Sequence, residues 1–328
     1  MKKFYTIIFL LLTFTAQVWC EDGDIFTAKT AEGIDMEFKV VSEADKTCQV
    51  GSGNSCAIST YYAGHLIIPE RITFEGVEYT IISIGKNSFR RCSRLSGSLT
   101  IPNSVTTIGD YAFEGCTGFT ASLSIPYSLK EIGNYVFSGC SGFFNKLYIP
   151  NSVVKIGNGA FSGCNFTGSL TIPNGVTSIG ERAFSVCKNM VGPLTIGNSV
   201  VTIGDYAFSG CSGFTGSLKI PSSVESLGRS AFDGCYGLTS VSIPNSVTSI
   251  GDGAFFGCSG LTSVTIPNSV TTIGNNTFYG CSGLTSVAIP NSVTIIGHSA
   301  FYSCSGLTSV AIPNSVTTIA GDAFLGCI

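Results

Sequence analysis

The hydrophobic and polar positions of this sequence repeat with a period of 23 or 24 residues over most of its length. In each unit, Leu or Val and Ile alternate with polar residues over a few positions, as do Leu261, Val264 and Ile266. This alternation predicts a half-buried strand. A proline then ends the strand, because proline cannot donate a hydrogen bond within a sheet.

The second half of each unit predicts a turn on the other side of the coil. Val270 and Ile273 point inward again, a glycine bends the chain, and residues 275–281 form a short helical or 3₁₀ turn. This turn buries a phenylalanine and, three positions later, a cysteine. The cysteines of the eleven units are Cys92, Cys116, Cys140, Cys164, Cys187, Cys211, Cys235, Cys258, Cys281, Cys304 and Cys327. Because one coil cannot bury its own two flat faces, the units predict a solenoid of stacked coils.

Residues 1–20 form a separate segment. They begin with Met-Lys-Lys and continue with an apolar run, which is typical of a secretory signal peptide. The alternative is a lipoprotein signal with a lipid anchor at Cys20, although Trp19 is bulky where such sites favour a small residue. The apolar run is short for a membrane-spanning helix. We therefore predict a secreted or cell-surface protein without a transmembrane span.

Residues 21–82 predict a small β-rich capping region, since apolar and polar residues alternate there between glycine-containing breaks. Cys48 and Cys56 lie in this region, eight positions apart and outside the register of the repeats. Because secreted proteins meet oxidising conditions, we predict a disulfide between them; the alternative is two small buried residues. At the other end the chain stops at Ile328 without the polar cap that terminal repeats normally carry, which favours a cover from elsewhere or a shortened relative.

The composition restricts the kinds of molecule that the chain is expected to bind. Charged residues make up 11% of the chain, hydrophobic residues 44%, and the net charge is -3. Nucleic-acid binding is not predicted, because it requires clustered Lys and Arg. The polar surface is built from Ser, Thr, Asn and Gly, which suit short turns.

The periodic cysteines predict a column of reduced, buried thiols. Equivalent side chains in stacked coils point the same way, so their Cβ atoms stay about 4.8 Å apart, whereas a disulfide needs about 3.8 Å. No close Cys or His pair has the spacing of a zinc site. We expect no metal and no cofactor.

Enzymatic activity is not predicted. The two histidines, His65 and His298, lie in the capping region and in a late repeat, too far apart along a solenoid to share a site. The sequence contains no serine-hydrolase elbow, no zinc-protease helix motif and no phosphate-binding loop.

Residues that depart from the repeat pattern are the candidates for binding. The outward position of the predicted strand carries a small residue in most units, but Tyr148 and Lys219 break this pattern. Phe144 and Lys146 accompany Tyr148, and we predict that these four residues contact a partner, since aromatic and cationic side chains dominate interface hot spots. A second departure follows the core phenylalanine, where Phe256, Tyr279, Tyr302 and Leu325 replace polar residues. This stripe is either an exposed self-association surface or part of the core.

Two motifs carry a resemblance to a known family. The run Leu-x-x-Val-x-Ile in residues 261–266 resembles the strand of leucine-rich repeats, and the pattern Ile-Pro-Asn-Ser-Val with its following Ala-Phe and Cys is similar to the BspA-type subclass. The resemblance covers about residues 81–328. It implies a leucine-rich repeat solenoid with a curved parallel sheet on one side, short helical or 3₁₀ turns on the other, and repeats over residues 83–328. It also implies a role in surface attachment or protein recognition without enzymatic activity.

Three functions follow from these observations. The first is a non-enzymatic recognition or adhesion module that binds a host or microbial surface protein through the concave sheet. The second is a structural spacer or self-associating scaffold at the cell surface. The third is binding of surface glycans, which the absence of Trp after residue 19 makes less favoured.

Overall fold

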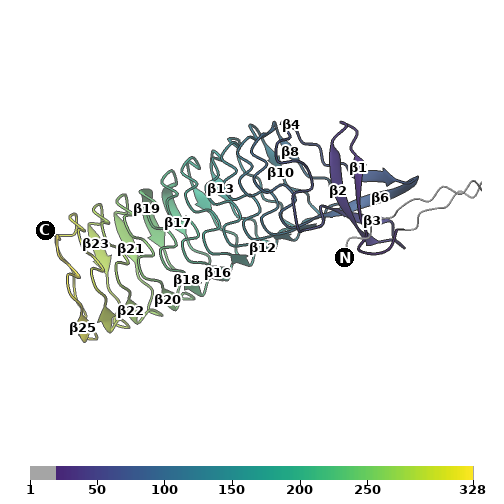
Figure 1. Ribbon diagram of the computed structural model, residues 1–328. Coiled ribbons are helices and arrows are strands. Elements are labelled where there is room, and N and C mark those ends of the chain that lie inside the picture. The colour runs from purple at the N-terminus through teal and green to yellow at the C-terminus, as the bar shows by residue number, and fades with distance from the viewer. Residues whose placement is uncertain (1–19, 328) are drawn as a thin grey trace, which may run out of the picture.

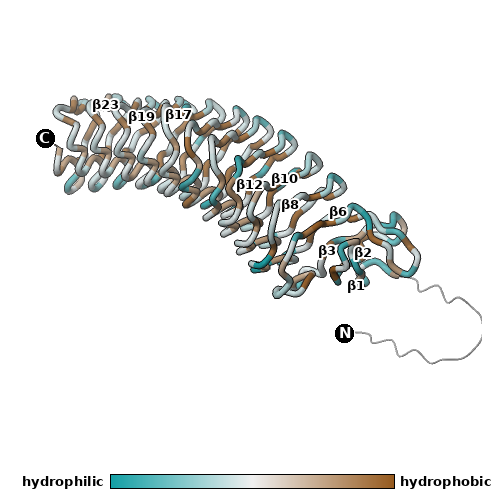
Figure 2. Tube along the Cα trace, turned by 90° about the horizontal axis from the view of Figure 1, so that it is seen from above, coloured by the Kyte–Doolittle hydropathy of each residue, from teal (hydrophilic) through white to brown (hydrophobic). Residues whose placement is uncertain are grey.

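The computed structural model describes residues 20–327, so the predicted signal peptide lies, except for Cys20, outside the described residues. The chain forms a long solenoid with a β-rich region at one end and the C-terminus at the other (Figure 1). Seen from above, the stack of coils follows a bend (Figure 2). The described residues are built from strands and turns, and no helix is found among them.

The N-terminal region is a mixed sheet that continues into the repeats. Its strands follow the order β1-β2-β3-β6-β5, and β6 also pairs in parallel with β9 of the first repeat. Their bounds are β1 Ile25–Lys29, β2 Asp35–Ser42, β3 Thr47–Val50, β5 Arg71–Phe74, β6 Val77–Ile84 and β9 Thr107–Ile108. A second pair, β4 Gly64–His65 and β7 Leu95–Ser96, is also parallel. The stacking of coils therefore begins within the capping region.

One side of the repeats carries the strands that the Leu-x-Ile alternation predicts. These first-row strands pair in parallel in three groups, β8 with β10, β13 with β15, and β17 through β19 and β21 to β23. Their bounds are β8 Leu99–Thr100, β10 Leu123–Ser124, β13 Leu170–Thr171, β15 Leu194–Thr195, β17 Thr215–Lys219, β19 Gly237–Ser242, β21 Ser263–Thr265 and β23 Ser286–Ala288.

A second row of parallel strands forms after the proline, where the sequence predicted only inward-pointing residues. Each strand has two residues, and the strands pair in two groups, from β11 to β20 and from β22 to β25. Within a group the Ile or Leu of one strand pairs with that of the next, as the buried Ile132 pairs with Ile156. The strands are β11 Glu131–Ile132, β12 Lys155–Ile156, β14 Ser178–Ile179, β16 Thr202–Ile203, β18 Ser226–Leu227, β20 Ser249–Ile250, β22 Thr272–Ile273, β24 Ile295–Ile296 and β25 Thr318–Ile319.

The remaining side consists of turns, so the prediction of short helical or 3₁₀ segments there is wrong. Alternate amide groups bond in different directions: Ala112 N donates to Gly109 O within the coil, whereas Phe113 N donates to Val136 O in the next coil. Tyr111 also has a φ of 60°, outside the right-handed helical region. Because every second N–H is committed to the neighbouring coil, no continuous helical hydrogen-bond ladder can form.

The core is a spine of stacked phenylalanine rings that runs through all eleven repeats. Successive rings lie 5.0 to 5.6 Å apart between centroids, from Phe89 with Phe113 to Phe301 with Phe324. The periodic thiols lie beside the spine, and Cys116 Sγ donates to Phe89 O of the preceding coil at 2.9 Å. The repeated Phe and Cys therefore serve stacking, as the sequence predicted.

Candidate functional site

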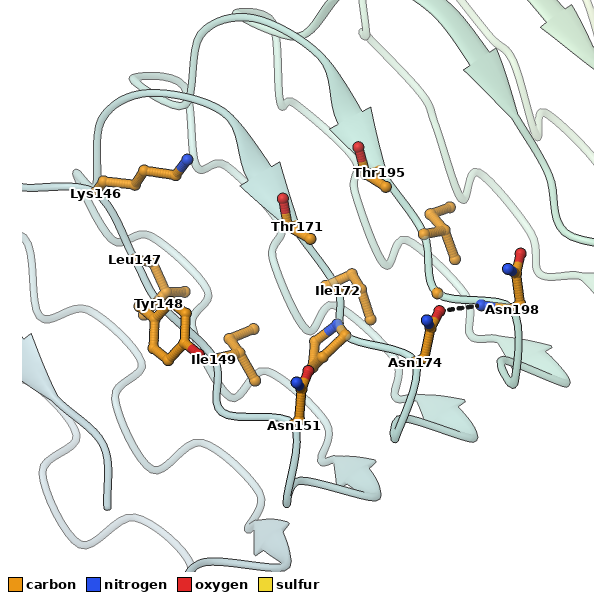
Figure 3. Close-up of a pocket in the computed structure, with 13 residues that line it drawn as sticks. Lys146, Leu147, Tyr148, Ile149, Asn151, Thr171, Ile172, Asn174, Thr195 and Asn198 are labelled. Atoms are coloured by element: carbon orange, nitrogen blue, oxygen red, sulfur yellow. Dashed lines mark hydrogen bonds between the residues drawn. The ribbon is translucent and has the colours of Figure 1, made fainter. Parts of the chain in front are cut away.

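A groove of about 540 Å³ crosses three consecutive coils on the side of the first-row strands (Figure 3). It begins at the coil that carries Tyr148 and passes over β13 and β15. Its lining residues are Lys146, Leu147, Tyr148, Ile149, Asn151, Thr171, Ile172, Pro173, Asn174, Thr195, Ile196, Gly197 and Asn198.

The groove coincides with an interruption of the first-row sheet. β10 ends one paired group and β13 begins the next, and residues 146–149 between them form no strand in the described structure. Leu147 and Ile149 still point into the core, where both are buried. The groove thus begins at a coil whose apolar side chains pack in the core as in the other repeats, but whose backbone does not pair as a strand.

Tyr148 and Lys146 form one end of the groove. Tyr148 is 58% exposed, and in Figure 3 the Lys146 side chain extends above the coil edge toward the strand that carries Thr171. Tyr127 of the preceding coil approaches Tyr148 edge-on, with ring centroids 6.4 Å apart, and is itself 67% exposed. The two rings form an exposed aromatic pair beside a lysine.

Sequence reasoning missed Tyr127, although a signal was present. Tyr127 occupies the place of the asparagine in Ile-Pro-Asn-Ser, where the neighbouring units carry Asn103 and Asn151. Its backbone N–H keeps the contact that an asparagine in this place makes, donating to Asn103 Oδ1 at 3.3 Å. Only the side chain therefore changes, and it adds aromatic surface next to Tyr148.

The other two residues predicted to bind a partner lie outside the groove lining. Phe144 is 53% exposed on the same coil as Lys146, and Lys219 is exposed at the end of β17. Along the row, Lys219 lies three coils after Tyr148, about 14 Å at the spacing of stacked strands. The structure therefore brings Lys146 and Tyr148 together, with Lys219 beyond the far end of the groove.

The rest of the lining combines apolar residues such as Ile172 and Ile196 with small or polar ones. Thr171 and Thr195 are paired across β13 and β15, and Asn198 N donates to Asn174 Oδ1 at 2.9 Å along the groove edge. Gly197 stands where the other units have proline, so no ring covers that position. Lys146 is the one charged residue of the lining, which makes the groove suited to carboxylate, carbonyl or hydroxyl groups of a ligand.

The second predicted surface, the aromatic stripe, lies on the turn side of the late repeats. Its rings stack at 4.6 Å for Phe256 with Tyr279 and 4.7 Å for Tyr279 with Tyr302. Phe256 is 37% exposed and Leu325 is 55% exposed, while the two tyrosines are half-buried. The stripe is thus a surface ridge whose members also pack on one another.

Phe256 also borders a second hollow, of about 250 Å³, that contains Arg229, Asp233 and Asp252. Burial raises the pKa of the Asp233 carboxyl, and a hydrogen bond from Ser209 opposes this effect. Ser209 Oγ lies 3.3 Å from Asp233 Oδ2. The hollow therefore contains a carboxylate whose cost of burial is only partly offset by its hydrogen bond with Ser209.

The disulfide between Cys48 and Cys56 stays a prediction, and the structure places the two cysteines as follows. Both are free thiols. Cys48 lies in β3 and is fully buried in the core of the capping region, whereas Cys56 Sγ faces the first repeat and donates to Arg90 O at 3.2 Å. Cys48 thus lies within the sheet of the capping region, and Cys56 lies at its junction with the first repeat.

The remaining polar candidates are separate from one another. His65 and His298 are both exposed, and His298 N donates to Asn275 Oδ1 in a turn. Within residues 20–327, no group of three or more His, Cys, Asp or Glu residues is placed to hold a metal ion. The described part of the chain likewise has no helix with the length and apolarity needed to cross a membrane.

Comparison with known proteins gives a family match for the repeats. The family model described as BspA type leucine-rich repeat region matches residues 82–215 and 202–328, with six copies. No curated protein matches the sequence.

Two solved structures resemble the chain along most of its length. A leucine-rich cell surface protein from Faecalibacterium prausnitzii is 28% identical, with 92% of each chain covered and a TM-score of 0.51. A leucine-rich repeat protein from Bacteroides ovatus is 29% identical, covering 89% of this chain and 91% of the other, with a TM-score of 0.48.

Proposed function

Because the chain belongs to the BspA-type leucine-rich repeat family, we propose that it is a cell-surface recognition module that binds a protein partner through the groove at Lys146 and Tyr148. The similarity to a leucine-rich cell surface protein supports the location. The predicted secretory signal of residues 1–20 agrees with it.

The observation that carries the proposal is the exposed pair Tyr127 and Tyr148 at the mouth of a groove. Elsewhere along the first row the outward side chains are mostly small, as Thr171 and Thr195 are. Tyrosine supplies a large contact area at low entropic cost and is enriched at hot spots. A partner segment that lies along the groove would cover both rings and offer an acidic or carbonyl group to Lys146.

The test compares binding of the full chain and a double variant, Lys146→Ala with Tyr148→Ala, to immobilised extracellular-matrix and bacterial-surface proteins. We expect at least one protein to bind the native chain and to bind the double variant at least about 30-fold more weakly, since hot-spot residues are worth 2 kcal/mol or more. Tyr61→Ala is the matched control, because Tyr61 is 79% exposed in the capping region. Equal binding by the native chain and the double variant would contradict the proposal.

A glycan array probed with the same proteins separates the class of ligand. Exposed tyrosine rings and the row of Asn and Thr side chains also suit a sugar ring and its hydroxyl groups. Retention on glycans that is lost in the double variant would assign the groove to carbohydrate in place of protein.

The aromatic stripe supports a second function, self-association into a surface scaffold. Phe256 and Leu325 expose apolar surface on a continuous stacked ridge, and exposed apolar patches mark interaction sites. Changing Tyr279 and Tyr302 together to Ser should lower the mass measured by sedimentation if the ridge joins two copies. An unchanged mass with lower stability would assign the stripe to packing within one chain.

A further inference from the structure

The column of periodic thiols has one irregular member, and it is the first. In each later repeat the cysteine Sγ donates to the carbonyl of a phenylalanine in the coil before it, at 2.9 to 3.4 Å. Cys92 is fully buried, yet its Sγ donates to no carbonyl within the described residues. The coil that would supply such a carbonyl is replaced by the capping region.

A short segment of the capping region lies where that preceding coil would be. Ala57 N donates to Ser88 O at 2.7 Å, as the coils of the solenoid do to one another. Cys56 Sγ lies 3.2 Å from Arg90 O and packs against the core. Arg90 is two residues before Cys92, so Cys56 Sγ lies against the stretch of the first repeat that carries Cys92. The position next to Cys92 is therefore filled by another thiol.

We propose that Cys56 and Cys92 form a disulfide that ties the capping region to the first repeat. The pair differs from neighbouring thiols within the column. Cys56 belongs to the capping region and not to a stacked repeat, so its Cα–Cβ bond need not be parallel to that of Cys92. Two cysteines 36 positions apart would then close a covalent loop across the junction between the capping region and the solenoid. Such a bond stabilises a fold chiefly by restricting the unfolded chain.

Cys56 is suited to begin the reaction. It is only partly buried, whereas Cys92 is inaccessible. A hydrogen bond from Cys92 lowers the pKa of the Cys56 thiol to about 7, burial opposes this, and the charge of Arg90 adds to the lowering. A substantial fraction of Cys56 is therefore thiolate near neutral pH, and the thiolate is the nucleophile in disulfide exchange.

The oxidant is an external disulfide, such as oxidised glutathione or a protein disulfide. The Cys56 thiolate attacks one sulfur of this disulfide and releases the other as a thiolate, which leaves a mixed disulfide on Cys56. The Cys92 thiol then attacks Cys56 Sγ, and its proton passes to the second thiolate as that thiolate leaves. Two protein thiols are oxidised and one external disulfide is reduced to two thiols, so electrons and protons balance.

The structure favours this pair over the one that closeness in sequence suggests. Cys48 is fully buried in β3, paired with Ile81 of β6, and burial raises the pKa of its thiol to about 12. Cys48 therefore lies within the sheet of the capping region, whereas Cys56 Sγ lies against Arg90 O of the first repeat. Cys48 remains a buried thiol while Cys56 reacts with Cys92.

The test is a disulfide map of the folded full chain after exposure to oxidised glutathione. Free thiols are alkylated in denaturant, and the protein is digested with trypsin without reduction. Cys48 and Cys56 share the tryptic peptide of residues 47–71, whereas Cys92 lies in residues 92–94. We expect a linked species of these two peptides that disappears on reduction, and a denaturation midpoint that is higher before reduction than after it.

Variants assign the sulfurs. Cys56→Ser should abolish the linked species and the effect of reduction on the midpoint, whereas Cys48→Ala should retain both. If Cys56→Ser does not fold, the map of the native chain decides alone, with fragmentation of the linked species to distinguish Cys48 from Cys56. A peptide 47–71 with an internal disulfide, or full alkylation of Cys56 and Cys92 after oxidation, would overturn the proposal.

Discussion

The rings of Phe184 and Phe208 lie parallel to within 3°, with their centroids 5.4 Å apart. The two residues occupy the same place in successive coils, and both are fully buried. Each ring therefore covers one flat face of the next coil, and this contact is repeated along the whole spine. The spacing exceeds the 4.7 to 4.9 Å between paired strands, which is consistent with coils that fan apart along a bend (Figure 2).

Phe208→Ala should be strongly destabilising. Removing a buried ring leaves a cavity between two other rings, and such changes cost about 3 to 5 kcal/mol in the free energy of unfolding. Urea unfolding followed by circular dichroism measures the loss. Phe144→Ala is the matched control, because the same side chain is removed at a position that is 53% exposed, where the cost should stay below about 1 kcal/mol. Equal losses would show that the spine is not the main source of stability.

The spine could be predicted from the sequence because its cause is local and periodic. A phenylalanine and a cysteine at fixed offsets can be buried only if equivalent residues stack, so the position of Phe208 over Phe184 follows from the period. The second row of strands could not be recognised in the same way. A single unit shows Ile132 as an inward residue, but its pairing with Ile156 exists only between coils.

The incorrect prediction of helical turns has the same physical origin. Within one unit, residues 109–116 have the spacing of a helical turn, yet the N–H groups of Tyr111, Phe113 and Gly115 bond to the next coil. In the groove, Tyr148 was predicted from its outward strand position, whereas Tyr127 comes from the turn after the strand and reaches Tyr148 only because the coils stack.

A ladder of side-chain amides stabilises the bend at the glycine that follows the second-row strand in several repeats. Asn158 N donates to Asn134 Oδ1 at 2.8 Å, and Glu181 N donates to Asn158 Oδ1 at 2.9 Å. Asn158→Ala removes the acceptor for Glu181 N, so we expect a loss of about 0.5 to 1.5 kcal/mol in the free energy of unfolding. Chemical denaturation measures it.

Asn158→Asp is the matched control for this ladder. Asp110 already accepts from Asn134 N in the equivalent place at 2.7 Å, so a carboxylate oxygen can replace the amide oxygen. The aspartate variant should retain most of the stability that the alanine variant loses. If both variants lose the same amount, the amide donor and not the acceptor oxygen is what matters.

Gly197 departs from the proline of the other units for a packing reason. A Cβ atom added there would lie 2.4 Å from Pro173 O and 2.6 Å from Pro173 C, and backbone atoms cannot move aside easily. Gly197→Ala should therefore cost about 1 to 3 kcal/mol, the usual range for overpacking. The thermal or urea midpoint measures the change.

Gly321→Ala is the control for added bulk at a glycine. A Cβ atom there would first meet His298 Nδ1 at 3.4 Å, an ordinary contact with a flexible side chain. Its effect should stay within about 0.5 kcal/mol. A small effect at Gly197 as well would mean that the coil can relax, and that glycine is not required at this edge of the groove.

Asp233→Asn should stabilise the protein at neutral pH. Burial raises the pKa of this carboxyl above its ordinary value of 3.8, so the folded chain holds the proton more tightly than the unfolded chain does. Folding therefore carries a penalty at pH 7, which is relieved as the pH falls through the raised pKa. Asparagine keeps an oxygen that can accept from Ser209 Oγ but has no charge. The gain should stay below about 1 kcal/mol, because the group is partly exposed and screened by solvent.

The pH dependence distinguishes this effect from a general change in net charge. The difference in unfolding free energy between Asp233→Asn and the native chain should be largest near pH 7 and should shrink toward pH 4, as the native carboxyl takes up its proton. Asp252→Asn removes the same charge at an exposed position of the same hollow and serves as the control. If both variants give the same pH profile, the gain comes from net charge, and burial of the Asp233 carboxyl is not its cause.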